Sequence, residues 1–212
     1  MEMSKYPRTP HLPWSEGASK DDKLLKNIDH FSGKSISISI KLDGENTTMY
    51  RNGLHARSLD SKDHPSRHWV KAYHASVRHN IPKGWRVCGE NLYAKHSIHY
   101  LNLPSYFMVF LIANENNVCL STEGTEYFCE QNGFTHVPVI YRGIGGPLIK
   151  SFSAVEALVR GNFHEGYVVR LSDDFRLENF DVSVAKYVRK NHITTDDHWM
   201  YKEVVPNQLR DM

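Results

Sequence analysis

One alternating segment near the start of the chain constrains the fold more than any other feature. Isoleucine or leucine stands at every second position from Ile36 to Leu42, and the positions between them carry serine and then Lys41. Successive side chains of a strand point to opposite faces, so the pattern predicts a strand with one buried face and one polar face. The turn signal Asp43-Gly44 follows directly. We therefore expect Lys41 to lie on the polar face, at the edge of a bend that a ligand can approach closely.

Three further short motifs follow this lysine turn. They are Gly89-Glu90-Asn91-Leu92-Tyr93, Glu165-Gly166-Tyr167-Val168-Val169-Arg170 and Lys186-Tyr187-Val188-Arg189. Alone, each is more often an ordinary surface turn or strand end. Together with Lys41-Leu42-Asp43-Gly44-Glu45-Asn46, and in this order, they resemble motifs I, III, IV and V of the covalent nucleotidyltransferase superfamily, which comprises ATP-dependent RNA and DNA ligases and mRNA capping enzymes. Within it, the chain most resembles an ATP-dependent RNA ligase of the type-2, phage-like group.

The resemblance spans about residues 35 to 190 and implies a single nucleotidyltransferase (adenylation) domain over residues 1–212. The order of expected elements predicts an α+β fold of largely antiparallel sheets flanked by helices. Residues 1–20 contain three prolines and Trp14 and are expected to form an extended lead-in, with Trp14 docked on the body. Residues 191–212 are expected to form a short C-terminal tail. Because only 23 residues follow Arg189, we expect no OB-fold domain of the kind found in DNA ligases and capping enzymes.

The other elements follow from periodicity and turn signals. A hairpin is expected around Asn52-Gly53, with both residues at positive φ. A helix should begin at Asp63 and Pro65 and end at Ile81; its predicted buried face consists of Trp69, Ala72, Tyr73, Ser76 and Val77. Further strands are expected at residues 85–90, 106–113, 137–141, 165–171 and 182–189. Further helices are expected at residues 121–133 and from Ser153 to Gly161.

The resemblance implies a role for each matching residue. Lys41 would attack the α-phosphorus of ATP and form lysyl-AMP. Asn46 matches the asparagine that acts near the reactive phosphate during sealing, and Glu90 matches the glutamate that hydrogen-bonds the ribose. Glu165 matches the glutamate that acts on a divalent metal, Mg²⁺ or alternatively Mn²⁺. Lys186 would contact the α-phosphate, and a lysine nucleophile needs a lowered pKa, which nearby cations or burial can supply.

Three more residues are expected to bind the nucleotide. Arg57, which the hairpin returns to the Lys41 end, matches the family arginine that contacts the nucleotide. Phe110 matches the aromatic residue that stacks on adenine, although relatives often have aspartate where this chain has Leu111. Arg189 stands near the second lysine of motif V, but alternation turns it to the opposite face from Lys186 unless a bulge intervenes.

The implied activity is transfer of AMP to the 5′-phosphate of RNA, followed by sealing to a 3′-hydroxyl. Two alternatives stay open: an adenylyltransferase that stops at AMP transfer, and a catalytically silent module that binds nucleic acid. The intact Lys41, Glu90, Glu165 and Lys186 argue against the silent module. Asn46 argues against the adenylyltransferase, because in the family it serves the sealing step.

Charge is unevenly distributed along the chain. Residues 54–99 carry eight lysines and arginines against three acidic residues. Such a stretch suits a polyanion, although it is also typical of a solvated face. The candidates for backbone phosphate contacts with RNA are Arg67, Lys71, Arg78 and Lys95.

His64 and His68 have a spacing that can bind zinc, but no third ligand accompanies them, so a basic surface helix is favoured.

Cysteine usage and the N-terminus bear on location. Cys88, Cys119 and Cys129 form no CxxC pair and are typical of reduced thiols in a cytosolic protein. The N-terminus has no apolar signal segment, and no apolar run approaches membrane-spanning length. We therefore expect a cytoplasmic protein with no membrane partner. A monomer is also expected, although these features leave the oligomeric state open.

Overall fold

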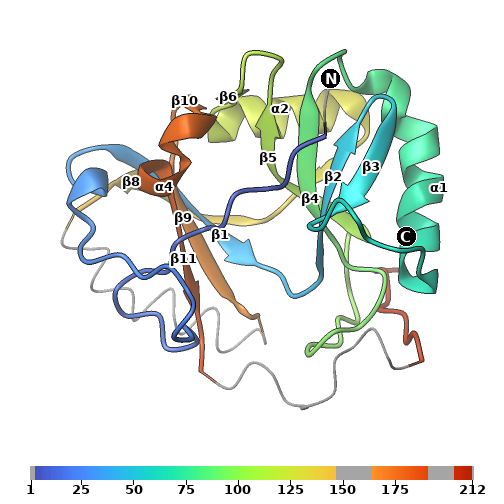
Figure 1. The fold of residues 1–212 in the computed structure, drawn as a ribbon, viewed down its shortest axis with the longest axis horizontal. Coiled ribbons are helices and arrows are strands. Elements are labelled where there is room, and N and C mark those ends of the chain that lie inside the picture. Colours follow the sequence, from blue (N-terminus) through green and yellow to red (C-terminus); the bar gives the residue numbers. More distant parts are fainter. Residues whose placement is uncertain (1–2, 147–163, 191–202, 212) are drawn as a thin grey trace.

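Two β-sheets form the framework of the fold (Figure 1). The computed structural model describes residues 3–146, 164–190 and 203–211. Four strands form the first sheet in the order β11-β9-β1-β8: β1 (Ser35–Lys41), β8 (Val139–Ile144), β9 (Gly166–Leu171) and β11 (Val184–Val188). The second, seven-stranded sheet has the order β10-β6-β5-β4-β2-β3: β2 (Glu45–Tyr50), β3 (Gly53–Ala56), β4 (Arg86–Asn91), β5 (Phe107–Ala113), β6 (Val118–Cys119) and β10 (Phe175–Arg176). The seventh strand, β7 (Thr135–His136), pairs parallel with β5, and the other neighbours pair antiparallel.

Helices cover and connect these sheets. The α-helices are α1 (His68–Val77), α2 (Thr122–Asn132) and α4 (Phe180–Ser183), and the 3₁₀ helices are η1 (Asp29–Phe31), η2 (Pro65–Arg67), η3 (Arg78–Asn80) and η5 (Leu177–Asn179). The expected α+β fold of largely antiparallel sheets with flanking helices is confirmed. The helix expected from Ser153 to Gly161 lies outside the described residues.

Strand β1 forms where the alternation predicts it. Ile36 and Ile38 are fully buried and pack with Tyr167 and Val169 on one face of the four-stranded sheet. The serine face is also enclosed: Ser37 is 2% exposed, and its hydroxyl is 2.6 Å from that of Thr122. Ser39 and Lys41 lie on the same face and border a space that Glu90 and Phe110 of the seven-stranded sheet also line, so this face looks toward the second sheet.

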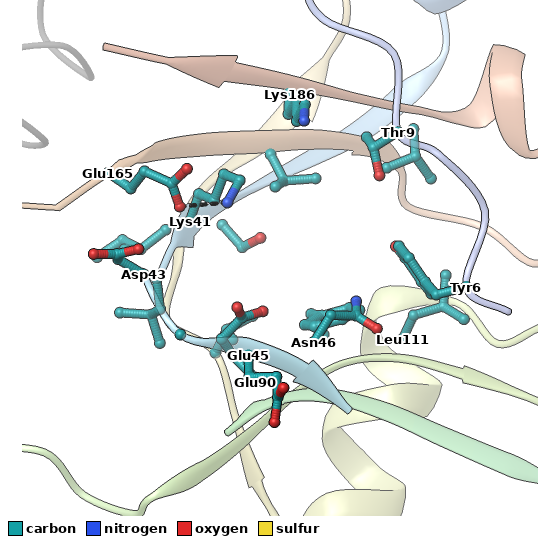
Figure 2. Close-up of a pocket in the computed structure, with 18 of the residues that line it drawn as sticks. Tyr6, Thr9, Lys41, Asp43, Glu45, Asn46, Glu90, Leu111, Glu165 and Lys186 are labelled. Atoms are coloured by element: carbon teal, nitrogen blue, oxygen red, sulfur yellow. Dashed lines mark hydrogen bonds and ion pairs between the residues drawn. The ribbon is translucent and has the colours of Figure 1, made fainter. Parts of the chain in front are cut away.

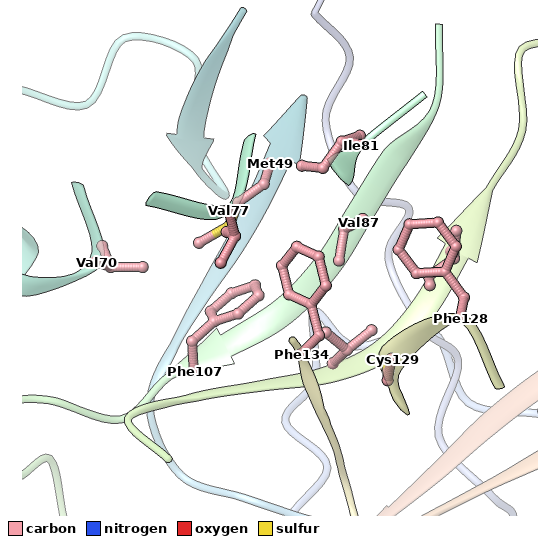
Figure 3. Close-up of a cluster of buried hydrophobic side chains, with 11 residues drawn as sticks. Met49, Val70, Val77, Ile81, Val87, Phe107, Phe128, Cys129 and Phe134 are labelled. Carbon is pink, nitrogen blue, oxygen red and sulfur yellow. The ribbon is translucent and has the colours of Figure 1, made fainter. Parts of the chain in front are cut away.

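Helices α1 and α2 pack on the outer face of the seven-stranded sheet. Figure 3 shows the cluster of buried hydrophobic side chains between the helices and the sheet. The prediction of which α1 residues are buried is wrong in part. Val70, His74 and Val77 are its buried residues, whereas Ala72 and Ser76 are exposed. The ring of His74 explains the shift, because its Nε2 donates to the Tyr50 carbonyl at 2.7 Å and so satisfies a polar group inside the interface.

Two turn predictions have different outcomes. The β2–β3 hairpin exists, but Tyr50 pairs with Gly53, so Arg51 and Asn52 form the loop. Among the described residues positive φ occurs at Asn117, Gly33, Gly84 and Gly133, so the expected positive φ is wrong for both Asn52 and Gly53. Helix α2, by contrast, has the expected ends: the Ser121 hydroxyl caps its start, and Gly133, with φ of 74°, ends it.

One strand boundary also needs correction. The strand expected from residue 182 begins at Val184, because the preceding residues belong to α4. The His64 ring caps η2 by accepting from the Ser66 amide. Within residues 3–146, 164–190 and 203–211 no group of three or more metal-ligating side chains occurs.

The N-terminal segment ties the two sheets together (Figure 1). Ser4 accepts from Arg86 of the seven-stranded sheet at 2.5 Å. Further along, the Lys186 amide donates to the Pro10 carbonyl at 2.9 Å, which attaches the segment to β11. Trp14 docks as expected, with Nε1 donating to the Tyr167 hydroxyl at 2.9 Å. No helix among the described residues is long and apolar enough to cross a membrane.

Candidate active site

A cavity of about 530 Å³ lies between the two sheets, within the usual size range of small-molecule sites. Side chains from both sheets and from the N-terminal segment point into it (Figure 2). Seven of the eight residues expected to act on ATP or RNA ends line this cavity: Lys41, Asn46, Arg57, Glu90, Phe110, Glu165 and Lys186. Residues from four separate motifs therefore converge on one site.

Glycines allow the motif strands to approach closely at this site. A Cβ atom on Gly166 would lie 1.9 Å from the Tyr187 carbonyl oxygen, and one on Gly44 would lie 2.5 Å from that of Asn91. Both distances are too short for a side chain. Because Gly166 pairs with Lys41, this close packing places Glu165 beside the end of β1.

Lys41 forms an ion pair with Glu165 (Figure 2). The Lys41 side chain is 23% exposed and that of Glu165 is 10% exposed, so water screens the pair only partly. Burial alone lowers the pKa of Lys41, but the carboxylates of Glu165, Glu90 and Asp43 outweigh it and raise this pKa above its ordinary value. The expected lowering of the lysine pKa is therefore wrong for this arrangement of side chains.

Lys186 is the second cation facing the cavity. It pairs with Val168 across β11 and β9, two rows of residues along the sheet from the Lys41–Gly166 pair and therefore on the same face. Burial, and then the positive charge of Lys41, lower the pKa of Lys186. Arg57 is exposed and lines the same cavity, so Lys186 and Arg57 can both offer positive charge to a polyphosphate beside Lys41.

Glu90 lies on β4, opposite the four-stranded sheet. Burial raises its pKa from an ordinary 4.5 to about 8; Lys41 opposes this rise, and the carboxylates of Glu165 and Asp43 add to it. The side chain is therefore largely protonated at neutral pH. A protonated carboxyl can donate as well as accept a hydrogen bond, which suits recognition of a hydroxyl group.

The raised pKa of Glu90 predicts a pH dependence of stability. The native state keeps a proton that the unfolded chain has released above pH 4.5, so the free energy of unfolding should fall as pH rises from about 4.5 to 8. Glu90→Gln imitates the protonated form, so its stability relative to wild type should increase across this window. Urea unfolding at pH 5 and at pH 8 measures the difference.

The matched control is Glu130→Gln on the exposed face of α2. This variant should follow wild type at both pH values. If Glu90→Gln also showed the same stability relative to wild type at pH 5 and pH 8, Glu90 would not carry the raised pKa.

Asn46 and Phe110 line the cavity from the seven-stranded sheet. The Asn46 side-chain oxygen is buried and has no hydrogen-bond partner among the described residues, so it can accept from a ligand. The Phe110 ring is half-buried and offers an apolar surface. A nucleotide would fit this cavity: its planar base would lie against the apolar Phe110 ring, and its phosphates would lie near the cations.

Two predicted contact residues lie elsewhere. Arg189 is absent from the described cavity lining, and its Nε donates to the His164 carbonyl at 2.8 Å. Arg67, expected to be a surface phosphate contact, is 6% exposed and bonds both carboxylate oxygens of Glu45, at 2.8 and 2.5 Å. Such a bidentate pair occupies the guanidinium, so the expectation for Arg67 is wrong.

Several lining residues are absent from the sequence-based set: Tyr6, Thr9, Asp43, Glu45 and His96. Tyr6 is the most distant in sequence from the motifs. Its ring meets Phe110 edge-on at 5.2 Å and Phe180 at 5.3 Å. The prolines around it predict only an extended segment, so no periodicity or motif marks it as part of the site.

The carboxylates fit a weakly anchored divalent cation. Glu165 could hold such a cation, since it faces the cavity beside Lys41, and Glu90 and Asp43 lie near enough to influence Lys41 electrostatically. The described residues include no cluster of three or more metal-ligating side chains. Such a site suits Mg²⁺, which is usually bound by one or two carboxylates together with substrate phosphates and water.

Comparisons with known proteins identify the family and the fold of the chain. A family model described as RNA ligase matches residues 34–188. An archaeal ATP-dependent RNA ligase is similar in structure, with a TM-score of 0.61 and 13% sequence identity over 88% of this chain and 48% of that chain. A putative ATP-dependent DNA ligase from Aquifex aeolicus has a TM-score of 0.57 and 19% identity over 88% of this chain and 50% of that one. A Naegleria gruberi RNA ligase solved with pyrophosphate has a TM-score of 0.56 and 18% identity, over 91% and 63% respectively.

At these identities the solved structures show a shared fold, one that RNA and DNA ligases have in common. This chain spans about half the length of the archaeal and Aquifex proteins. The search of curated proteins finds no match. The family model nevertheless covers most of the chain, from the residue before β1 to the end of β11, and includes Lys41, Glu90, Glu165 and Lys186. The chain belongs to the RNA ligase family.

Proposed function

We propose that this chain is an ATP-dependent RNA ligase that acts through a lysyl-AMP intermediate. The observation that carries the proposal is the position of Lys41. It ends β1 inside a cavity of nucleotide size, with Glu165 paired to it and with Lys186 and Glu90 facing the same space. Family membership supports the activity, and the cavity supports the assignment of these residues.

The proposed reaction has three steps, each a nucleophilic attack on phosphorus. The neutral Lys41 amine attacks the α-phosphorus of ATP; an N–P bond forms, and the bond to the departing pyrophosphate breaks. A 5′-phosphate oxygen of RNA then attacks the same phosphorus, which breaks the N–P bond and leaves AMP joined to the RNA end. Finally a 3′-hydroxyl attacks the activated 5′-phosphate, forming the phosphodiester and releasing AMP.

Lys41 must lose a proton before the first attack, because only the neutral amine is nucleophilic. Glu165 stabilises the ammonium form, so its contact with Lys41 must weaken as ATP binds. Lys186 would then face the α-phosphate and stabilise the charge that develops there. When bound, a divalent metal, Mg²⁺ or Mn²⁺, would neutralise phosphate charge, and Glu165 would hold it. A Naegleria gruberi RNA ligase variant solved with ATP and manganese supports this choice of cofactors.

The remaining residues bind and orient the substrates in this proposal. Phe110 stacks on the base, Glu90 hydrogen-bonds the ribose, and Arg57 meets the phosphates at the cavity mouth. We propose that residues 1–212 form one nucleotidyltransferase domain that acts as a monomer on RNA with 5′-phosphate and 3′-hydroxyl ends. The three free, buried cysteines support a reducing compartment, and we place the protein in the cytoplasm.

An RNA-joining assay with an Asn46→Ala variant separates a ligase from an enzyme that stops at AMP transfer. Wild type should convert a 5′-phosphorylated, labelled RNA into joined product with ATP and magnesium. Asn46→Ala removes a side-chain oxygen that is buried and unpartnered in the described structure, so joining of a pre-adenylylated RNA should fall by roughly 100-fold. Gel separation of substrate, adenylylated RNA and product measures each step.

Asn52→Ala, in the exposed loop of the same hairpin, is the control and should join RNA normally. If wild type adenylylated RNA without joining it, the protein would be an adenylyltransferase. If it accepted no AMP and bound RNA alone, the silent binding module would replace the ligase proposal.

A further inference from the structure

The segment 203–211 packs on the loop of residues 92–103, which borders the cavity. Isolated bridges pair Ala94 with Pro206 and Leu103 with Leu209. Backbone hydrogen bonds of 2.8 to 2.9 Å join the two segments: Lys95 N to Val205 O, Asn207 N to Tyr93 O, Gln208 N to Tyr100 O, Leu103 N to Gln208 O, and Arg210 N to Leu103 O. The segment is therefore fixed along its length, although its residues are mostly exposed.

Asn207 is the buried residue of this segment, at 1% exposure. Its side-chain oxygen accepts from the Tyr100 amide at 2.9 Å, and its side-chain nitrogen donates to the Leu92 carbonyl at 2.7 Å. Its backbone carbonyl accepts from the Tyr106 hydroxyl at 2.9 Å. One side chain thus holds both ends of the stretch 92–100, and its loss would leave buried backbone groups unpaired.

The other side of this loop holds the turn that follows Lys41. The Asp43 carboxylate accepts from the amides of Ser97 at 2.7 Å and Ile98 at 3.0 Å. The Asp43 amide donates to the Tyr100 hydroxyl at 2.9 Å. Leu42 is 5% exposed and packs with Ile98 and Tyr100 in one apolar cluster. The two residues after Lys41 therefore contact the loop through both polar and apolar groups.

Tyr100 links the two sets of contacts, because its amide bonds Asn207 and its hydroxyl bonds the Asp43 amide. A short chain of contacts runs from Asn207 through Tyr100 to Asp43, two residues from Lys41. The same loop carries His96 into the cavity lining. These contacts thus connect the turn after Lys41 to a segment more than 160 residues later in the chain.

We propose that Asn207 is a positioning residue for AMP transfer: it fixes the loop 92–103, and the loop fixes the turn after Lys41. The proposal rests on the proposed function and extends it to a segment that the ligase motifs do not include. Displacing a reacting group by about 1 Å can cost on the order of 100-fold in rate, so a remote residue can have a large effect.

The test is the single-turnover rate of AMP transfer from ATP to Asn207→Ala. This rate constant describes the active molecules and is independent of their number, so a variant that merely folds less well would keep it. We expect it to fall by roughly 10- to 100-fold, with the KM for ATP changed much less. Gln208→Ala, the exposed neighbour whose backbone makes the same kind of contacts, should match wild type.

Tyr100→Phe provides a second, milder variant. It keeps the ring in the apolar cluster and removes only the hydroxyl that bonds the Asp43 amide, so it should lower the same rate constant. Combined with Asn207→Ala, its effect should be less than multiplicative, because both changes act on one chain of contacts. Full multiplication of the two effects, or an Asn207→Ala rate equal to that of Gln208→Ala, would overturn the proposal.

Amide hydrogen exchange measures the same coupling between Asn207 and the Asp43 turn, and it does not require enzyme activity. Asn207→Ala should speed exchange at Ser97 and Ile98, whose amides bond Asp43, and Gln208→Ala should not. If wild type accepted no AMP, the proposed function would fail, while faster exchange would still establish that Asn207 holds the turn. Unchanged exchange would refute the positioning role itself.

Discussion

A Lys41→Arg variant is expected to lose ATP-driven joining of RNA by roughly 10⁴-fold or more, the scale on which covalent enzymes respond to loss of a catalytic group. Arginine keeps a positive charge beside Glu165, but its guanidinium stays protonated and cannot form the N–P bond. An RNA that already carries AMP on its 5′-phosphate does not need the nucleophile. The variant should therefore still join this pre-adenylylated RNA, and a comparison of both substrates by gel measures the two activities.

Lys34→Arg is the matched control, since Lys34 is an exposed lysine just before the same strand. It should join RNA from ATP at the wild-type rate. ATP-driven joining by Lys41→Arg at a substantial fraction of that rate would show that another group accepts the AMP.

The second large effect is expected for Glu165→Gln, through two separate causes. The variant removes the negative charge of the proposed metal ligand, so AMP transfer at saturating ATP should fall by at least about 100-fold, because loss of a residue that merely supports a metal ligand already costs about 10- to 100-fold. It also removes the partner of the Lys41 ammonium, so the pKa of Lys41 should fall and the rising limb of the pH–rate profile should move to lower pH. Single-turnover transfer measured across pH separates the two causes.

Asp181→Asn is the control for this experiment, because Asp181 pairs with Lys23 on the exposed surface. Its pH–rate profile should overlay that of wild type. A Glu165→Gln profile that is lowered but not displaced in pH would mean that the ion pair does not set the pKa of Lys41, and an undiminished rate would contradict the metal role.

Local sequence determines the elements that position the site. The alternation from Ile36 to Lys41 predicts β1, and the caps at Ser121 and Gly133 predict α2, because both signals involve neighbouring residues. The burial of Ser37 could not be predicted in this way. It depends on Thr122, 85 residues away, and on the second sheet that covers this face of β1.

The electrostatics of the site depend on contacts between distant segments. The motif predicts that Lys41 faces a ligand, but the sign of its pKa shift depends on Glu165, 124 residues further along the chain. Tyr6 and Asn207 have no motif of their own, and their places are set by packing against Phe110 and Tyr100. Their contributions could be identified only once the two sheets and the terminal segments were placed together.

The most direct test of the account is to trap the intermediate on wild-type protein. Protein treated with pyrophosphate, to remove AMP already bound, is incubated with magnesium and ATP labelled at the α-phosphate, denatured, and digested for peptide mapping. The lysyl-AMP proposal predicts label on the peptide that contains Lys41, lost in acid and retained in alkali, as a phosphoramidate requires. Label on a different residue, or no covalent label on metal-replete protein, would contradict it.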